Sequence, residues 1–311
     1  MDGLLLINKR RGTTSYEVVK KVKQILKAEK VGHIGTLDPV AEGLLPLCLG
    51  KATKLTPFLQ ELDKTYRGRM VFGITTSTFD EEGEIIKEKD ASSLTREQVE
   101  SIFSRFKGKI LQTPPAYSAI HWQGKRLYNL AREGVEVKVL PRKVEIYELK
   151  LLNFFPGIHP QAEFELRCSR GTYIRSLCRD IGEISGYGAY QVYLCRIGVG
   201  PFNLSHARTI EELVEIKSKG GEIEEILYST DEILPHFPKV TVKRGVERLV
   251  KWGRPLYLTH FSQLPSNLEK GDRVRICSQE GELLAIAKSC QSSSHFTKDQ
   301  VGFKYLRVFV Q

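Results

Sequence analysis

A single carboxylate stands in a glycine-rich loop near the N-terminus of this 311-residue chain. The loop reads Gly-His-Ile-Gly-Thr-Leu-Asp-Pro over residues 32–39, with Asp38 as the carboxylate and His33 five positions before it. The two glycines permit backbone angles that other residues resist, so a large ligand can approach the main chain closely. The proline after Asp38 disfavours helical geometry there and keeps Asp38 in a turn or extended conformation. The pattern fits either a catalytic carboxylate or a common Asp-Pro turn.

The charge of the chain favours a phosphate-rich partner. Forty-seven Lys and Arg residues stand against 37 Asp and Glu, which gives a formal net charge of +10. Residues 1–30, which lead into the glycine loop, hold eight basic and three acidic residues. A basic surface beside one loop carboxylate is suited to an anionic polymer rather than an acidic protein.

The cysteines and apolar runs predict a cytoplasmic protein. Six scattered cysteines form no Cys-x-x-Cys pair and no zinc-ligand spacing, which is typical of a reducing compartment. The apolar run at residues 4–7 stops at Asn8 and is too short for a signal peptide. No apolar run approaches the roughly 20 residues needed to cross a bilayer. We therefore expect no membrane segment.

No cofactor motif is complete. Residues 43–53 superficially resemble a phosphate loop, but Leu45 and Ala52 stand where a Walker A motif needs glycine and serine or threonine. No glycine fingerprint for a dinucleotide follows a strand, and no pair of histidines has metal-ligand spacing. We therefore expect no metal, nucleotide or redox cofactor.

The elements that must position the loop alternate irregularly. Capping boxes at Thr14 with Glu17 and at Thr95 with Gln98 predict helices that run to about residues 27 and 107. Apolar runs and turn signals predict strands at 4–8, 44–49, 66–72, 143–151, 162–168 and 191–199, and helices at 51–62 and 173–184. Without a βαβ rhythm, this order predicts an α+β domain built on a largely antiparallel sheet.

Three further segments interrupt or follow that domain. The acidic stretch 75–90 reads as a surface excursion, and residues 110–140, broken by Pro114-Pro115, read as an inserted, partly mobile arm. The sequence Leu-Pro-His-Phe-Pro at 234–238 is a boundary signal. We predict a catalytic domain over residues 1–234. Short strand-like runs after it predict a small β-barrel over residues 235–311.

Four separated segments, in order along the chain, resemble the TruB family of tRNA pseudouridine synthases. They are Leu-Ile-Asn-Lys at 6–9 with Gly-Thr-Thr-Ser at 12–15, the loop from 32 to 44, Lys-Thr-Tyr-Arg at 64–67, and Arg-Gly-Thr-Tyr-Ile-Arg at 170–175 with Tyr-Leu-Cys-Arg at 193–196. The tail after residue 237 resembles a PUA domain, an RNA-binding β-barrel. The chain departs from the common family pattern at Arg10, where relatives usually have proline.

The resemblance implies that the chain isomerises uridine 55 to pseudouridine in the T-loop of tRNA, without a cofactor or a protein partner. Asp38 would attack the uridine or take a proton from its sugar. The N-glycosidic bond would break, the uracil would turn, and a carbon–carbon bond would form through C5. An aspartate with the usual pKa near 3.9 is already ionised at neutral pH, so Asp38 needs placement more than a raised pKa.

The resemblance also assigns roles around Asp38. Tyr66 would stack on the flipped uridine, with its hydroxyl available for the final proton removal at C5. Arg175 would pair with Asp38 and balance its charge. Tyr173 and Leu194 would form walls of the pocket, although each could equally be a core residue.

Other residues would bind the RNA around the flipped base. His33 would fill the space that the extruded base leaves, and Lys9 would support the loop or a phosphate. The inserted arm would close over the T-stem loop, with Lys125, Arg126 and Arg132 following phosphates, which makes binding sensitive to salt.

Two other functions remain open from the sequence. One is an RNA-guided synthase of the dyskerin type, which shares the aspartate loop but generally lacks the arm at 110–140. The other is a tRNA-binding or folding factor whose catalysis is incidental. The intact set of Asp38, Tyr66 and Arg175 argues against lost chemistry.

Overall fold

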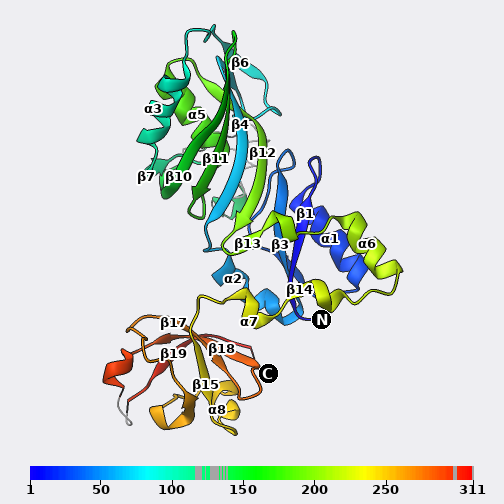
Figure 1. Ribbon diagram of the computed structural model, residues 1–311, viewed down its shortest axis with the longest axis vertical. Helices are drawn as coiled ribbons and strands as arrows, with labels where there is room; N and C mark the ends of the chain where they lie inside the picture. The colour runs from blue at the N-terminus through cyan, green and yellow to red at the C-terminus, as the bar shows by residue number, and fades with distance from the viewer. Residues whose placement is uncertain are drawn as a thin grey trace.

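A long mixed sheet and a smaller second sheet form the framework of the molecule (Figure 1). The computed structural model describes residues 1–115, 121–122, 124–126, 133, 135, 137, 139–296 and 300–309. In chain order, the strands of the long sheet are β1 (Gly3–Lys9), β2 (Val31–His33), β3 (Glu42–Leu49), β4 (Lys64–Phe72), β7 (Gly108–Gln112), β10 (Arg142–Phe155), β11 (Gln161–Cys168), β12 (Ala189–Val199), β13 (Phe202–Asn203) and β14 (Leu227–Tyr228).

The long sheet consists of two antiparallel halves joined by one parallel pair. The strand order is β14-β1-β3-β12-β4-β11-β10-β7, with β2 beside β3 and β13 beside β12. Only the β3–β12 pair is parallel, and it is short: Cys195 lies opposite Glu42 and Arg196 opposite Gly43. The predicted α+β domain on a largely antiparallel sheet is therefore confirmed.

Glycine is required where the two halves meet. A Cβ atom at position 43 would lie 2.4 Å from the carbonyl oxygen of Arg196, and Gly43 has φ +100°. A side chain here would separate β3 from β12 and is also disfavoured by the backbone angle. This junction lies at the end of the loop that carries Asp38.

The helices and short helical turns lie mainly around the two faces of the long sheet. Their bounds are α1 (Ser15–Leu26), η1 (Gly50–Leu55), α2 (Thr56–Leu59), α3 (Arg96–Arg105), α5 (Ile174–Ser185), η2 (Leu204–His206), α6 (Ile210–Ser218), η3 (Ile223–Ile226) and α7 (Thr230–Ile233). Both predicted capping boxes, at Thr14 and Thr95, are present. The predicted single helix over 51–62 is wrong, because Pro57 lacks an N–H and the chain forms a 3-10 turn followed by one short helix.

Alternate residues of β1 point into two separate cores. Leu5 and Ile7 belong to a buried cluster that also contains apolar residues of α1, α3 and α5, whereas Leu4 and Leu6 belong to a second cluster with residues of η1 and α2. This period of two is the normal consequence of strand geometry. The strand that begins the chain is thus buried on both faces and fixes the adjoining loops.

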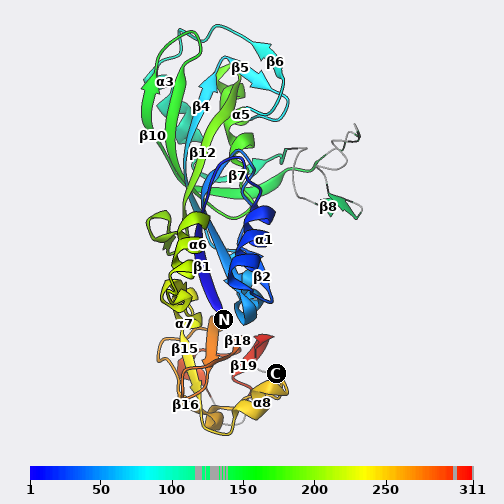
Figure 2. The same cartoon turned by 90° about the vertical axis from the view of Figure 1, so that its right-hand side faces the viewer.

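Two hairpins extend from the long sheet. One is formed by β5 (Ile74–Thr76) and β6 (Ile85–Glu88), and the other by β8 (His121–Trp122) and β9 (Lys125–Arg126), which projects to one side (Figure 2). The predicted start of the arm at residue 110 is wrong, because residues 108–112 form β7 and pair with β10. Much of the remaining predicted arm lies outside the described residues.

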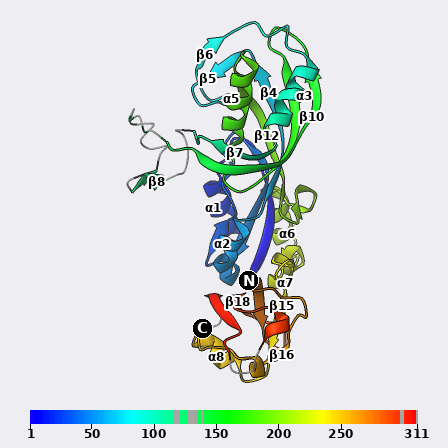
Figure 3. The same cartoon turned by 90° about the vertical axis from the view of Figure 1, so that its left-hand side faces the viewer.

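The second sheet lies at the end of the molecule opposite to the β5–β6 hairpin (Figure 3). Its elements are β15 (Lys239–Val242), α8 (Glu247–Lys251), η4 (Leu258–His260), β16 (Phe261–Gln263), β17 (Arg273–Cys277), β18 (Leu283–Ser289), η5 (Ser293–His295) and β19 (Phe303–Val308). The strand order β16-β15-β17-β18-β19 is open within the described residues, so the expected barrel is not closed. Rings of Phe261 and Phe303, with centroids 5.2 Å apart, join the two edge strands in place of a backbone ladder. None of the described helices is long and apolar enough to cross a membrane.

An apolar core joins the two sheets. Phe237, Ile286 and Phe309 belong to the same buried cluster as residues of η1, α2 and β13. The ring of Phe237 meets that of Phe58 edge to face, with centroids 6.3 Å apart. Because this cluster also contains Ile34, it extends to the loop that carries Asp38.

We predict that Phe237→Ala lowers the free energy of unfolding by about 3 kcal/mol, since it leaves a cavity in this shared core. Ile158→Ala, at a 64% exposed position, serves as the control and should change it by less than about 0.5 kcal/mol. Urea unfolding followed by circular dichroism measures both. Equal, small effects of the two substitutions would show that the two sheets do not share a packed core.

Candidate active site

The loop between β2 and β3 is tied to the turn between β1 and α1 on both sides of Asp38. The Ser15 hydroxyl accepts a hydrogen bond from the Leu37 N–H at 2.9 Å and donates one to the Leu37 carbonyl at 3.0 Å. The Gly12 N–H donates to the Pro39 carbonyl at 2.9 Å. The backbones on both sides of Asp38 are therefore held in place, by the Ser15 hydroxyl and by the Gly12 N–H.

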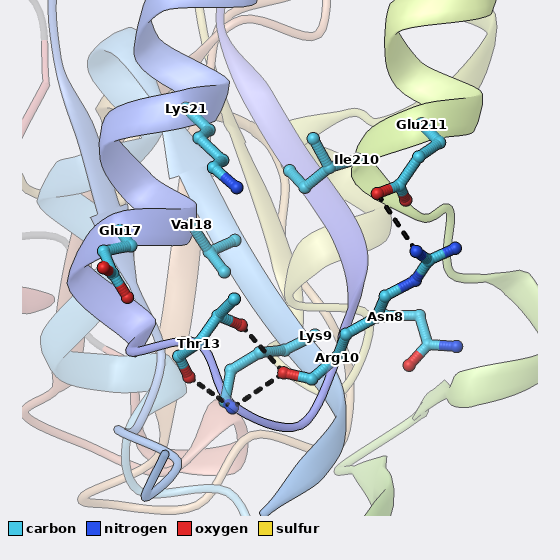
Figure 4. Close-up of a pocket in the computed structure, with 9 residues that line it drawn as sticks. All are labelled: Asn8, Lys9, Arg10, Thr13, Glu17, Val18, Lys21, Ile210 and Glu211. Atoms are coloured by element: carbon cyan, nitrogen blue, oxygen red, sulfur yellow. Dashed lines mark hydrogen bonds and ion pairs between the residues drawn. The ribbon is translucent and has the colours of Figure 1, made fainter.

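Lys9 lies beneath the same loop and is almost completely buried. Its ammonium group donates to the carbonyls of Ala41 at 2.6 Å and Thr13 at 2.7 Å, with longer contacts to Arg10 and Pro39. Figure 4 shows the ammonium group turned toward the β1–α1 turn. Burial lowers the pKa of Lys9 to about 8. Of the two roles expected for Lys9, the structure shows the first, support of the loop.

Arg175, in the first turn of α5, binds two carboxylates with its two terminal nitrogens. Its Nη2 lies 3.0 Å from Oδ2 of Asp38, and its Nη1 lies 3.1 Å from Oδ2 of Asp80. The side chain of Asp38 is 41% exposed, whereas those of Arg175 and Asp80 are 7% and 2% exposed. The expected Arg175–Asp38 pair is present, and Asp38 is the only one of the three groups open to a ligand.

Asp80 was not expected from the sequence. It belongs to the acidic stretch 75–90 that predicted a surface excursion, and nothing in its spacing distinguishes it from Glu81 or Glu82. The β5–β6 hairpin instead folds back on β12, where the Gln191 N–H donates to the Phe79 carbonyl at 3.0 Å. The Asp80 carboxylate also accepts from the Thr78 hydroxyl and from the Glu82 N–H, so its position is fixed independently of Arg175.

Arg196 of β12 is a second residue that sequence reasoning missed. It is 1% exposed, and it donates from Nε to the Leu44 carbonyl at 2.8 Å and from Nη2 to the Gly35 carbonyl at 3.0 Å. These bonds hold the first part of the loop against the sheet junction. A signal was present, since Arg196 ends the Tyr-Leu-Cys-Arg segment that supported the family resemblance.

Tyr66 lies opposite Arg196 in the β4–β12 register and is buried. Burial raises the pKa of its hydroxyl, which therefore stays protonated at neutral pH. Nearby on β4, Lys64 is also buried and donates to the Gln60 carbonyl at 2.7 Å, and burial lowers its pKa to about 8. Tyr66 and Leu194 belong to the same apolar cluster as Leu37, next to Asp38.

The other predicted site residues that the structure describes lie at the start of α5, at the end of β2 and in β9. Tyr173 is the N-cap residue of α5, and the side-chain amide of Gln112 of β7 donates to its carbonyl and accepts from its N–H. His33 ends β2, and burial lowers the pKa of its ring, which favours the neutral form. Lys125 and Arg126 are described only as backbone in β9, and Arg132 lies outside the described residues.

This arrangement offers one half-exposed carboxylate on a rigid loop, a paired guanidinium and a buried aromatic ring. Within the described residues, no group of three or more His, Cys, Asp or Glu side chains has the geometry to hold a metal ion. The chemistry of the described centre is that of a positioned nucleophile or base beside an apolar wall.

Comparison with known families shows the family of the chain. The model of the N-terminal domain of TruB family pseudouridylate synthases matches residues 23–174, and that of the C-terminal domain of tRNA pseudouridylate synthase B matches residues 175–235. The chain belongs to the TruB family of pseudouridylate synthases.

Individual relatives match over nearly the whole chain. A protein named tRNA pseudouridine synthase B from Pelotomaculum thermopropionicum is 40% identical, over 98% of this chain and 96% of its own. A protein of the same name from Geobacillus thermodenitrificans is 42% identical, over 92% and 94%. Among solved structures, a Cbf5–Nop10–Gar1 complex contains a chain that is 28% identical with a TM-score of 0.77, over 99% of this chain and 85% of that one.

We predict that the single-turnover rate of pseudouridine formation falls as the pH rises through about 8. Loss of a proton from Lys9 removes a positive charge near Asp38 and one N–H donor from the loop. Lys9→Met should lower the rate at pH 7 by about 100-fold, the scale of a small misplacement of catalytic groups, and should abolish this pH dependence.

Lys64→Met is the matched control, because Lys64 is also buried and its pKa is also near 8, but it makes no hydrogen bond to the loop among the described residues. The Lys64→Met variant should keep the fall in rate as the pH rises through about 8. If Lys9→Met kept this fall in rate and Lys64→Met lost it, Lys9 would not be the titrating group.

Proposed function

We propose that this enzyme isomerises uridine 55 in the T-loop of tRNA, with Asp38 as the catalytic carboxylate. The observation that carries the proposal is the ion pair between Asp38 and Arg175 at 3.0 Å, with Asp38 half-exposed on a loop fixed at both flanks. A uridine within a structured RNA loop must be flipped out to reach such a carboxylate.

The residues around Asp38 suit a flipped pyrimidine. Tyr66 provides an aromatic face and Leu194 an apolar wall, and both lie in the cluster that contains Leu37. Tyr173 borders the site from the start of α5. We assign Tyr66 to stacking rather than to the removal of the C5 proton, because its raised pKa disfavours the phenolate that a base would need.

The reaction needs an ionised Asp38. The carboxylate either adds to the uridine and is later released, or removes a proton from its sugar and later returns it. The N-glycosidic bond breaks, the uracil rejoins the sugar through C5, and the proton that C5 loses is balanced by one that N1 gains. Arg175 pairs with one oxygen of the carboxylate and fixes the direction of the other. The pairing and the loop geometry make the contribution of the protein a matter of placement.

We assign RNA binding to the periphery of this centre. His33 fills the place of the extruded base, and the arm that follows β7, up to residue 140, contacts the T-stem loop through Lys125, Arg126 and Arg132. Residues 1–234 form the catalytic domain, and residues 235–311 form a PUA-like RNA-binding domain. The enzyme acts in the cytoplasm and needs no cofactor and no protein partner.

A second candidate is an RNA-guided synthase. The observation that favours it is the similarity to the chain of an H/ACA ribonucleoprotein bound to a substrate RNA, which is 27% identical with a TM-score of 0.76. Activity on naked tRNA without a guide distinguishes the two. We favour the stand-alone enzyme because the segment between β7 and β10 is long enough to form an arm.

We predict that the purified chain releases tritium from C5-labelled uridine in a T-arm transcript with no cofactor, guide or second protein. Asp38→Asn should abolish release, because the amide keeps the shape of the carboxylate but not its charge. RNA affinity should change by less than about threefold, since Asp38 does not neutralise a phosphate.

Moving the labelled uridine along the transcript maps the site that is modified. Release by the Asp38→Asn variant would refute the assignment of Asp38. Failure of both proteins on naked RNA, with binding intact, would favour the RNA-guided alternative.

A further inference from the structure

We infer that the outward face of α1 binds the phosphate backbone of the stem that carries the reacting loop. The inference deepens the proposed function and rests on it. It concerns a surface formed by Tyr16, Lys20, Lys23 and Lys27, which we name the α1 stripe.

The α1 stripe is a narrow row on the helix surface. Tyr16, Lys20 and Lys23 lie at spacings of four and three residues, which places them on one face of α1. Lys27 is the C-cap residue, in the left-handed conformation just past the end of the helix. The opposite face, with Val18, Val22 and Leu26, is buried against the long sheet. All four members of the stripe are exposed, and the ring of Tyr16 is 74% exposed.

The charges of the stripe lack ion-pair partners among the described residues. No ion pair there involves Lys20, Lys23 or Lys27, whereas some exposed cations elsewhere are paired, such as Arg67 with Glu165 and Lys219 with Glu215. Three adjacent unpaired ammonium groups repel one another, and a row of phosphates would relieve that repulsion.

The stripe begins at the catalytic loop. Ser15, one residue before Tyr16, holds the backbone of Leu37 beside Asp38. From that point α1 runs toward the second sheet, on the same side of the molecule as the β8–β9 hairpin, as Figures 2 and 3 both show. An RNA whose loop reaches Asp38 from this side therefore has α1 beside the start of its stem.

The dimensions match a nucleic-acid strand. At 1.5 Å per residue, Lys20 and Lys27 are about 10 Å apart along the helix axis. Successive phosphates of one strand of a duplex advance by about 3.4 Å along its axis, so three lysines span about three phosphates. Tyr16, at the end nearest Asp38, is placed to stack on an unpaired nucleotide of the loop.

The test measures RNA affinity against salt for a triple variant, Lys20→Gln with Lys23→Gln and Lys27→Gln. Each lost phosphate contact should lower the slope of log affinity against log salt by about 0.9, so the slope should fall by 2 to 3. The affinity for a T-arm hairpin at low salt should fall at least tenfold. The rate at saturating RNA should stay within twofold of the wild-type rate, because none of the three contacts the reacting groups.

The matched control removes the same charge elsewhere, by Lys87→Gln, Lys107→Gln and Lys217→Gln, all at exposed positions. The control variant should have a slope of log affinity against log salt within about one of the wild-type value. A hairpin whose stem is cut to two base pairs should bind the wild type and the stripe variant with similar affinity, because the phosphates that the stripe contacts are gone.

The outcomes separate this inference from the proposed function. If the stripe variant and the control variant lower the slope of log affinity against log salt equally, the α1 stripe does not bind the stem. The same conclusion follows if the stripe variant still binds the short-stem hairpin more weakly than the wild type does. If the wild type binds the hairpin but forms no pseudouridine, the proposed function fails whatever the slopes are. Tyr16→Ala should weaken RNA binding at least fivefold without changing the slope of log affinity against log salt. An unchanged affinity would show that Tyr16 does not contact the RNA.

Discussion

The site depends on one guanidinium group that is shared between two carboxylates. Arg175 is buried, and its terminal nitrogens bind the half-exposed Asp38 and the buried Asp80. A lone buried guanidinium would be costly, and Asp80 offsets that cost while leaving Asp38 exposed. Because Asp80 is itself held by the β5–β6 hairpin, Arg175 presents a fixed nitrogen to Asp38. Pairing with one oxygen leaves the half-exposed carboxylate available for a substrate.

The loop that carries Asp38 is built on the same principle of buried cations with fixed acceptors. Lys9 and Arg196 lie on opposite sides of it, and their donors bind backbone carbonyls rather than carboxylates. Backbone carbonyls satisfy these groups without neutralising them, so both leave a positive field around Asp38. Such a field suits a phosphate-rich substrate. The junction of the two sheet halves at Gly43 lets these groups come together.

The local features of the fold could be predicted from the sequence, whereas the contacts between distant segments could not. Capping boxes such as that of Thr14 and the short apolar run of β1 depend only on neighbouring residues, and both predictions are confirmed. The break at Pro57 is equally local, because proline disfavours the interior of a helix. Asp80 could not be found, because its burial depends on contacts with β12 more than 100 residues away. The pairing of Arg175 with Asp38 came from family resemblance, since spacing alone gives no partner for that arginine.

The central claim is that the two terminal nitrogens of Arg175, each bound to a different carboxylate, position Asp38, and that the positive charge alone does not. Arg175→Lys tests it most directly, because lysine keeps the charge but cannot bind two carboxylates with separate nitrogens. The measurement is the single-turnover rate of pseudouridine formation with enzyme in excess over a T-arm RNA, alongside the RNA affinity. We predict a rate lower by at least about 100-fold, the scale expected for misplaced catalytic groups, with affinity within threefold of wild type. A rate within threefold of wild type would contradict the account, because charge alone would then be sufficient.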